Sequence, residues 1–395
     1  MTSEGLAITL FIMSITIAII LIFRGINIAL AILVAYLIYT IPVLGIDSMK
    51  TVIQTIDIST LNTLSSLILA MMLAELYREL RISEEVIKAL EKANIKLASI
   101  AIPMIIGLIP MPGGAYISAV MVNPIYDSIG LRPEEKTFVN FWFRHVWVSV
   151  WPLYQAIILS SAILGVNFIE IIKYTWIVAL ATMTSGLIIT QKMFPKAKFF
   201  YNDGRYRDLV HVWPFIVLAV LSLATPIPLP ISIILLIAIL VAVYGPNVET
   251  IYKALRYSLN STFIAFIILS LMFSNSIKIS GLAETLIKYL QNFTTISVAL
   301  IPFSVIIATG FEFTFVALTF PILKPLLQGY NLTLAFLGGV IGSMLSPTHA
   351  CLVLSSQYFK SPIKKVYKYT IPASILSIII TTTILLFYNS IVIMR

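Results

Sequence analysis

The chain has 395 residues, of which 59% are hydrophobic and 11% are charged, and its formal net charge is +9. This composition excludes a soluble globular domain and indicates a polytopic membrane protein that has no soluble segment long enough for separate chemistry. In such a protein an excess of Lys and Arg reflects orientation across the bilayer, so it does not indicate binding to nucleic acid. The single cysteine, Cys351, excludes an intrachain disulfide and a metal cluster of cysteines, and no metal or other cofactor is expected.

Apolar stretches that approach the roughly 20 residues needed to cross a bilayer recur along the chain and predict transmembrane helices. The predicted elements of the first half are Leu6–Phe23, Ile26–Val43, Leu61–Leu76, a segment broken by proline and glycine at 95–126, an interrupted helix at 137–161, and Tyr174–Thr190. The second half repeats this order as Val212–Ala224, Ile231–Tyr244, Leu259–Phe273, a broken segment at 295–327, an interrupted helix at 333–357, and Tyr369–Phe387. The predicted fold class is therefore an all-α polytopic membrane protein.

An internal repeat covers nearly the whole chain. Four residues of one short segment recur in the second half: Glu84, Ile87, Lys88 and Leu90 return as Glu284, Ile287, Lys288 and Leu290. Three prolines that follow this segment also align, Pro103, Pro124 and Pro152 with Pro302, Pro321 and Pro347. Residues 1–190 are predicted to form repeat 1, residues 191–211 a cytoplasmic linker, and residues 212–395 repeat 2.

The distribution of Lys and Arg favours treating both broken segments as re-entrant hairpins, because most of these residues then lie on the cytoplasmic side. This interpretation predicts about ten crossings plus two hairpins, with both termini outside. Each repeat then has an odd number of crossings, so the second copy is inverted. The protein is expected in the plasma membrane as a multi-pass protein.

Each interrupted helix has a proline and polar residues at its centre, which predicts two half-helices joined by unwound backbone. The first interruption is Pro152 to Gln155, and the second is Ser346 to His349. Unwound backbone at membrane depth is tolerated only where protein or a water-filled cavity satisfies it, so we expect substrate contacts here. The candidates are Tyr154, Gln155, Ser346, Thr348 and His349, of which His349 also qualifies as a proton carrier or as a structural core histidine.

The tips of the two predicted hairpins are a second group of candidates. The first tip contains Pro112, Gly113 and Gly114, and the second contains Gly310 and Thr314. Glycines allow a tight turn, and the helix that follows presents free N–H groups and a positive dipole end, so each tip is predicted to contact an anionic substrate. The alternative is a plain loop between two short helices.

Three ionisable residues lie inside apolar runs. Glu312, in the second hairpin tip, is predicted to carry a proton, with a cation ligand or a structural carboxylate as alternatives. Arg144 and His145 lie in the first interrupted helix, as an anion contact and a proton-handling group. Neighbouring residues on a helix point about 100° apart, so at most one of the two is expected to face the site directly. Alternatively, Arg144 reaches the membrane surface among tryptophans.

The motifs PMPGGA at 110–115, NFWFRH at 140–145 and SPTHACL at 346–352 resemble those of an uncharacterised, mainly archaeal membrane family of unknown function. That family is grouped with the ion transporter superfamily, alongside gluconate, citrate and dicarboxylate permeases. The resemblance spans the chain and implies inverted repeats, two hairpins, homodimers and an elevator-type motion. The hairpin tips of the dicarboxylate symporters carry Ser-Asn-Thr signatures that are missing here, so sodium coupling and dicarboxylate specificity are not implied.

These features predict a secondary active transporter of a small solute, an organic anion coupled to protons, embedded in the lipid bilayer. The alternatives are a cation or metalloid exchanger in which Glu312 is a ligand, and a passive channel. An enzyme is not expected, because the motifs HExxH and GxSxG and paired intramembrane aspartates are missing from the sequence.

Overall fold

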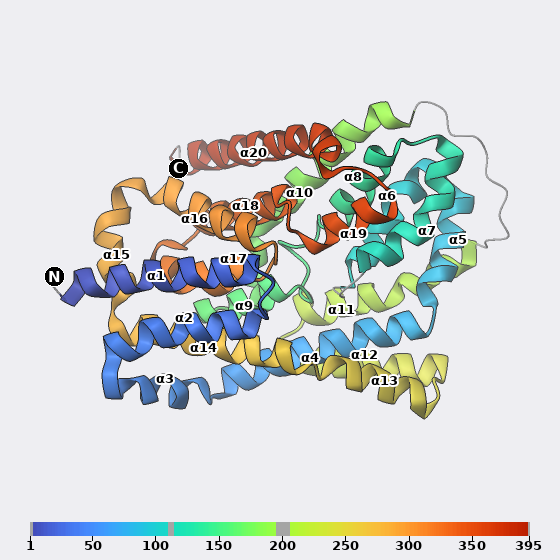
Figure 1. Cartoon of the computed structure of the whole chain (residues 1–395). Coiled ribbons are helices and arrows are strands. Elements are labelled where there is room, and N and C mark those ends of the chain that lie inside the picture. The colour runs from blue at the N-terminus through green and yellow to red at the C-terminus, as the bar shows by residue number, and fades with distance from the viewer. Residues whose placement is uncertain (1–2, 110–113, 195–205, 394–395) are drawn as a thin grey trace. The chain divides into compact units, whose positions relative to one another are not determined.

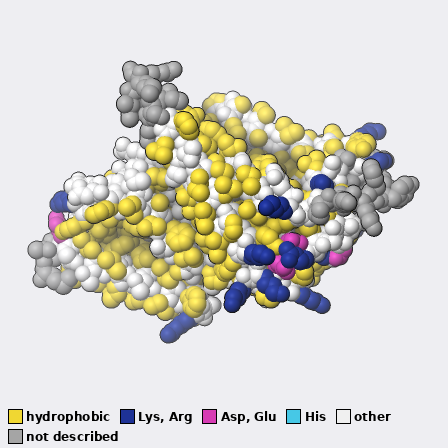
Figure 2. Space-filling view, turned by 90° about the horizontal axis from the view of Figure 1, so that it is seen from above, with side chains coloured by type: hydrophobic (Ala, Val, Ile, Leu, Met, Phe, Trp, Pro, Cys, Tyr) yellow, Lys and Arg dark blue, Asp and Glu magenta, His cyan; other side chains and the backbone are white. Residues whose placement is uncertain are grey.

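The computed structural model describes residues 3–109, 114–194 and 206–393, and over these residues the chain is helical with no β-strand (Figure 1). Nine helical stretches of this described part are long and apolar enough to cross a bilayer. Hydrophobic side chains cover much of the face seen in Figure 2, as expected of a surface that contacts lipid. The chain is therefore an all-α multi-pass membrane protein, which confirms the predicted fold class.

The helices follow the predicted order. The first half forms α1 (Ser3–Phe23), α2 (Ile28–Leu44), α3 (Ser48–Thr55), α4 (Ile58–Glu79), α5 (Ile82–Ala93), α6 (Ile95–Gly107), α7 (Gly114–Ile129), α8 (Pro133–Arg144), α9 (Gln155–Leu164) and α10 (Phe168–Thr190). The second half forms α11 (Trp213–Ala224), α12 (Leu229–Tyr244), α13 (Val248–Ser258), α14 (Ser261–Ser280), α15 (Leu282–Leu290), α16 (Thr294–Thr309), α17 (Thr314–Leu323), α18 (Tyr330–Leu345), α19 (Ala350–Tyr358) and α20 (Ile363–Ile393). Short 3₁₀ helices are η1 (Gly45–Asp47), η2 (Gln191–Met193), η3 (Tyr206–Val212), η4 (Gln291–Phe293) and η5 (Lys324–Leu326).

Packing divides the chain into two compact units. Unit 1 comprises Met1–Ser65, Gln155–Thr175 and Leu259–Thr348, and unit 2 comprises Ser66–Tyr154, Trp176–Ser258 and His349–Arg395. The chain passes between the units five times, twice inside the long helices α4 and α10 and twice at the helix interruptions. Each unit therefore contains segments of both predicted repeats.

The predicted repeat relates the two halves of the sequence, whereas the two units are defined by packing. The repeat therefore stays a prediction. The order of the helices agrees with it. Helix α3 begins at Ser48 and α13 at Val248, and α5 begins at Ile82 and α15 at Leu282, a spacing of 200 residues (248 − 48 and 282 − 82) in both cases. Part of the predicted linker, residues 195–205, lies outside the described residues.

Unit 1 is held together by close contacts between helices. Helix α2 packs on both α1 and α14, and the rings of Phe11, Tyr39 and Phe273 meet there with centroids 5.9–6.1 Å apart. Helix α16 packs on α18 so closely that a Cβ atom on Gly338 would lie 1.9 Å from the carbonyl oxygen of Ala299. Only glycine allows these two backbones to approach in this way.

In unit 2, helices α6, α7 and α8 pack on one another, α19 packs on α7 and α8, and α20 packs on α8. The buried Trp142 of α8 donates its indole N–H to the carbonyl oxygen of Thr182 in α10 at 2.8 Å. The hydroxyls of Ser185 and Ser377 join α10 to α20 at 2.7 Å. Such hydrogen bonds between helices pair polar groups that would be costly to leave without a partner inside a membrane.

Candidate functional site

Both interrupted helices are present as two half-helices. Helix α8 ends at Arg144 and α9 begins at Gln155, while α18 ends at Leu345 and α19 begins at Ala350. Pro152 and Pro347 lie in the two connections, where proline has removed a backbone donor. Each connection is also a point where the chain passes from one unit to the other.

The first connection is fixed to the end of α6 within unit 2. The hydroxyl of Tyr154 donates to the carbonyl oxygen of Gly107 at 2.9 Å, and the carbonyl oxygen of Arg144 lies 3.2 Å away. The indole N–H groups of Trp147 and Trp151 donate to the carbonyl oxygens of Met104 and Leu108, each at 2.9 Å. Carbonyl groups near the end of α6 are thus satisfied by aromatic side chains from the unwound segment.

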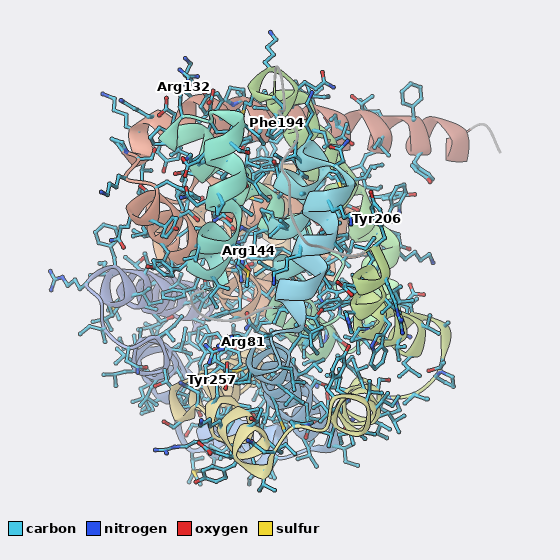
Figure 3. All side chains as sticks on the ribbon, turned by 90° about the vertical axis from the view of Figure 1, so that its right-hand side faces the viewer. Arg81, Arg132, Arg144, Phe194, Tyr206 and Tyr257 are labelled. Carbon is cyan, nitrogen blue, oxygen red and sulfur yellow. The ribbon has the colours of Figure 1, made fainter. Side chains whose placement is uncertain are left out.

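These contacts answer one of the open alternatives for Arg144. Trp142 and Trp151 are buried inside the unit, and Arg144 is only 4% exposed. This burial favours a contact of Arg144 inside the protein over a side chain that reaches the membrane surface. In Figure 3, Arg144 lies among the helices, whereas Arg132 lies at the edge of the molecule, where 56% of its side chain is exposed.

A cluster of four side chains, of which Arg144, His145 and His349 are buried and Cys351 is half-buried, surrounds the point where α8 ends and α19 begins. The Nε2 atoms of His145 and His349 are 3.2 Å apart, and Arg144 Nη1 donates to the sulfur of Cys351 at 3.4 Å. Both histidines are buried, and Nδ1 of His145 donates to the carbonyl oxygen of Phe141 at 2.6 Å. One ligand atom from each of His145, His349 and Cys351 lies within 4.8 Å of the other two.

In this cluster Arg144 and His145 both make contacts, although at most one of them was expected to face a substrate site. The 100° rule applies to neighbours within a helix. Arg144 is the last residue of α8, and His145 already lies in the turn that follows. Both side chains can therefore reach residues at the start of α19.

A buried polar network lies one turn of α8 before this cluster, and none of its residues was among the predicted site residues. Asn140 donates from Nδ2 to the Ala115 carbonyl oxygen at 3.0 Å and to the Ser355 hydroxyl at 2.9 Å, and its Oδ1 accepts from Ser118 at 2.7 Å. It joins α7, α8 and α19. The signal in the sequence was an asparagine inside an apolar helix, which is costly in a membrane unless it is satisfied.

Unit 1 holds the second hairpin turn and Ser346–Thr348 of the second connection. Ser346 donates to the carbonyl oxygen of Ile307 at 2.9 Å, and its hydroxyl lies 3.0 Å from that of Thr348. Gly310 adopts φ 73°, and a Cβ atom there would lie 2.6 Å from the Thr348 hydroxyl oxygen. The turn that follows Gly310 contains the partly buried Glu312. The second hairpin turn therefore packs directly on the second helix break.

The turn of the second hairpin is further fixed by threonines. Thr314 donates to the carbonyl oxygen of Phe311, and its hydroxyl lies 2.6 Å from that of Thr309. These hydroxyls are buried at the N-terminal end of α17. The rings of Phe311 and Phe313 lie beside them, with centroids 5.9 Å apart.

The predicted site residues fall into two groups, one in each unit. Unit 2 contains Gly114, Arg144, His145, Tyr154 and His349, and unit 1 contains Gln155, Gly310, Glu312, Thr314, Ser346 and Thr348. Pro112 and Gly113 lie outside the described residues. The sequence did not identify Cys351 or the Asn140 network as site residues, because their partners come from distant segments.

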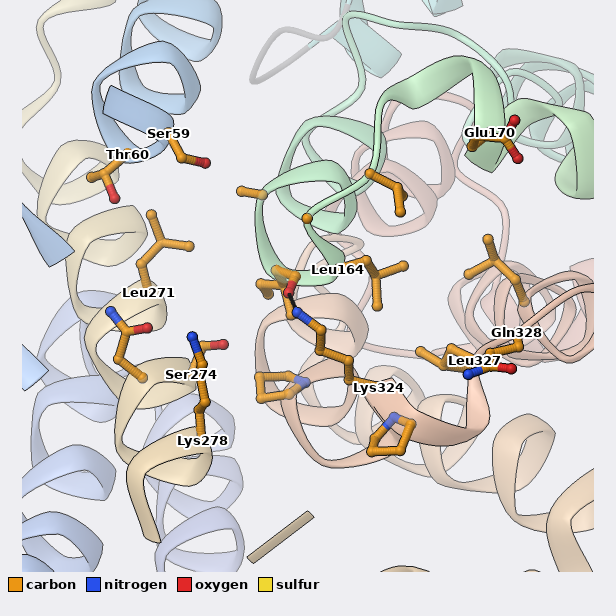
Figure 4. A pocket seen from close by; sticks show the side chains of 18 of the residues that line it. Ser59, Thr60, Leu164, Glu170, Leu271, Ser274, Lys278, Lys324, Leu327 and Gln328 are labelled. Carbon is orange, nitrogen blue, oxygen red and sulfur yellow. Dashed lines mark hydrogen bonds between the residues drawn. The ribbon is translucent and has the colours of Figure 1, made fainter. Parts of the chain in front are cut away.

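Unit 1 also contains a cavity of about 800 Å³ (Figure 4). It is lined by the start of α4, the end of α9, α14 and the end of α17. Lys324 donates from Nζ to the carbonyl oxygen of Ile163 at 2.8 Å, where α9 is about to end. The lining carries both charges, from Asp57, Glu170, Lys278, Glu284 and Lys324.

No curated protein matches this chain. A family described as "Protein of unknown function (DUF401)" matches residues 5–392, which is nearly the whole chain. The chain therefore belongs to the DUF401 family.

Proposed function

We propose that this protein is a secondary active transporter that moves a small organic anion, coupled to protons, by alternating access. We also propose that it belongs to the ion transporter superfamily, works by an elevator-type motion as a homodimer, and lies in the plasma membrane with both termini outside. No enzymatic activity is proposed.

The observation that carries the proposal is an arrangement that occurs in each unit. In unit 2, the break after α8 contacts the end of α6 through Tyr154 and Gly107. In unit 1, the break after α18 contacts the end of α16 through Thr348 and Gly310. Non-helical backbone at membrane depth is characteristic of transporters, where paired discontinuous helices in the two repeats form the substrate site.

The half-helices support an anionic solute. Helices α17 and α9 pack on each other in unit 1, and α7 and α19 pack on each other in unit 2. Three of them begin in a described turn or helix break, α17 at Thr314, α9 at Gln155 and α19 at Ala350, and α7 begins at Gly114. Helix N-termini carry partial positive charge and free N–H groups, which favour carboxylate and phosphate groups.

The cavity in unit 1 supports access for a solute of this size. Its volume, about 800 Å³, lies within the range of small-molecule pockets. Lys278 and Lys324 line it, and both belong to the side that the distribution of Lys and Arg places outside the cell. We propose that it is the external vestibule through which the anion enters.

Glu312 is the proposed proton carrier. It lies between Gly310 and Thr314, in the hairpin turn that packs on the break between α18 and α19. A carboxyl group at this depth can bind and release a proton as the environment of the turn changes during transport. A role as a cation ligand is the alternative.

The test is uptake into proteoliposomes of radiolabelled carboxylates and inorganic anions, under an imposed pH gradient and then under a sodium gradient. Wild type is compared with Glu312→Gln and with Glu249→Gln, whose carboxyl is 71% exposed on α13 of unit 2. We expect saturable uptake that follows the pH gradient. Glu312→Gln should bind the anion without accumulating it, and Glu249→Gln should behave as wild type.

Three outcomes would contradict the proposal. Flux of sodium or another cation that needs no anion and is lost in Glu312→Gln would make Glu312 a cation ligand. Flux that does not saturate and ignores both gradients would indicate a passive channel. Anion uptake that follows pH equally well in Glu312→Gln would leave the transporter in place but remove Glu312 as the carrier.

A further inference from the structure

The cluster in unit 2 has the composition of a metal site. Among the described residues, two imidazoles and a thiol come together at His145, His349 and Cys351, with ligand atoms within 4.8 Å of one another. They come from two segments of unit 2 that lie far apart in the sequence, the turn after α8 and the start of α19. Imidazole and thiolate are the ligands that Cu⁺ and Zn²⁺ prefer.

The spacing of the two imidazoles fits a shared metal ion. The Nε2 atoms of His145 and His349 are 3.2 Å apart. Two nitrogens bound to one metal at about 2.0–2.1 Å, with tetrahedral or trigonal angles, lie about 3.3–3.6 Å apart. Only a small movement of the rings is needed for both Nε2 atoms to bind the same ion.

The surroundings of His145 orient its ring for this role. Its Nδ1 lies 2.6 Å from the Phe141 carbonyl oxygen, and a carbonyl oxygen can only accept, so Nδ1 carries the hydrogen. In the neutral ring, the lone pair then lies on Nε2, which faces His349. Histidine ligands of metals commonly donate their other N–H to a backbone carbonyl in this way.

Arg144 decides between the candidate ions. Its guanidinium donates to the sulfur of Cys351 at 3.4 Å, so it lies directly beside a ligand atom of the proposed site. The same group places a positive charge beside a buried site, where each further charge is costly. A singly charged ion bound to one thiolate forms a neutral site, whereas a doubly charged ion leaves a second positive charge next to Arg144.

We propose that unit 2 binds one thiophilic metal ion per chain through His145, His349 and Cys351, and that it binds Cu⁺ more tightly than Zn²⁺. The site has three protein ligands, as in trigonal Cu⁺ sites and in zinc sites with an open position. This inference is independent of the transport function, because it concerns binding within one unit. It also assigns the two imidazoles as ligands, where the sequence predicts proton carriers.

The first test uses the wild-type chain, in which Cys351 is the single cysteine, so any alkylated thiol is this one. The purified protein, with its affinity tag removed, is treated with N-ethylmaleimide in ascorbate without oxygen, in the presence of Cu⁺, Zn²⁺ or Mg²⁺. Cu⁺ should slow alkylation by more than about tenfold, because a metal-bound thiolate is a poor nucleophile. Zn²⁺ should protect only at higher concentration, and Mg²⁺ should not protect.

The second test measures Cu⁺ affinity by competition with a coloured Cu⁺ chelator. Cys351→Ser and His349→Gln should each weaken binding by more than about 100-fold, since each removes one of three ligands. His211→Gln is the matched control, because the chain has three histidines and His211 instead contacts the hydroxyl of Tyr244. It should bind one Cu⁺ per chain, as wild type does. Monodisperse elution of each variant shows that it is folded.

Two results would overturn the proposal. One is a wild-type chain whose Cys351 is alkylated at the same rate with and without Cu⁺ or Zn²⁺. The other is Cu⁺ binding that is unchanged in Cys351→Ser and lost in His211→Gln. Tighter binding of Zn²⁺ than of Cu⁺ would overturn the choice of ion that rests on Arg144.

Discussion

The hydroxyl of Tyr154 donates to the carbonyl oxygen of Gly107 at 2.9 Å, and this bond ties the first helix break to the end of α6. The approach is so close that a Cβ atom on Gly107 would lie 2.2 Å from the carbonyl oxygen of Arg144. Gly107 and Tyr154, which are 47 positions apart, thus form one junction between a small residue and an aromatic hydroxyl.

Replacing Tyr154 with Phe should destabilise unit 2 by about 1–3 kcal/mol, because the Gly107 carbonyl is left buried without this donor. The change keeps the ring, so packing is preserved. Thermal unfolding in detergent, followed by intrinsic fluorescence, should show a lower midpoint for Tyr154→Phe. Tyr252→Phe is the control, since Tyr252 is 60% exposed on α13. Equal midpoints for the two variants would show that the bond contributes nothing.

Replacing Gly338 with Ala should disrupt the contact between α16 and α18, since the added Cβ would lie 1.9 Å from the Ala299 carbonyl oxygen. Relieving such a clash moves one helix and typically costs about 1–3 kcal/mol or more. Gly25→Ala is a useful comparison, because Gly25 has φ 79° but no atom within 4 Å of the added Cβ. It should cost about 1 kcal/mol through backbone strain alone. A Gly338→Ala protein as stable as Gly25→Ala would contradict the close packing.

Glu135 should make stability depend on pH. Burial alone would raise the pKa of its carboxyl, but hydrogen bonds from the Arg132 side chain and backbone, together with the Arg132 charge, outweigh burial and lower the pKa below its usual value. A carboxyl with a lowered pKa stabilises the folded state above the unfolded pKa of about 4.3, and this contribution is lost as the pH falls through the folded pKa.

The corresponding measurement is the unfolding midpoint of wild type and Glu135→Gln across pH. Wild type should be more stable at neutral pH, and the difference should shrink as the pH falls below the unfolded pKa of about 4.3 toward the lowered folded pKa of Glu135. A difference that stays constant down to about pH 3 would mean that the charge of Glu135 does not stabilise the fold.

Much of the fold was predictable from local patterns. Proline and glycine positions placed the two helix interruptions between α8 and α9 and between α18 and α19, and the second broken segment at the turn between α16 and α17. Short helices between the apolar ones were harder, because α3 and α13 are amphipathic and do not reach spanning length. The first break is also longer than predicted, since α8 already ends at Arg144, eight positions before Pro152. Aromatic side chains that bind to α6 hold this segment in an unwound state.

The candidate site was predictable only residue by residue. His145 and His349 were candidates separately, because each lies at a polar interruption in an apolar run. Their contact with each other and with Cys351 depends on α19 packing against α8, and no spacing within either segment encodes that. Asn140 shows the same limit: its cost in a membrane is evident from the sequence, but the hydroxyls that satisfy it come from two other helices.

The division of each interrupted helix between the two units has a consequence for biosynthesis. Unit 1 needs residues up to Thr348, and unit 2 needs residues from His349 onward. When the ribosome has made the first predicted repeat, α6, α7 and α8 have no α19 to pack against, and α9 has no α17. Unit 1 can therefore close only after Thr348 has been inserted, and unit 2 only after the segment that begins at His349, so the early helices of both units are in the membrane before their partners.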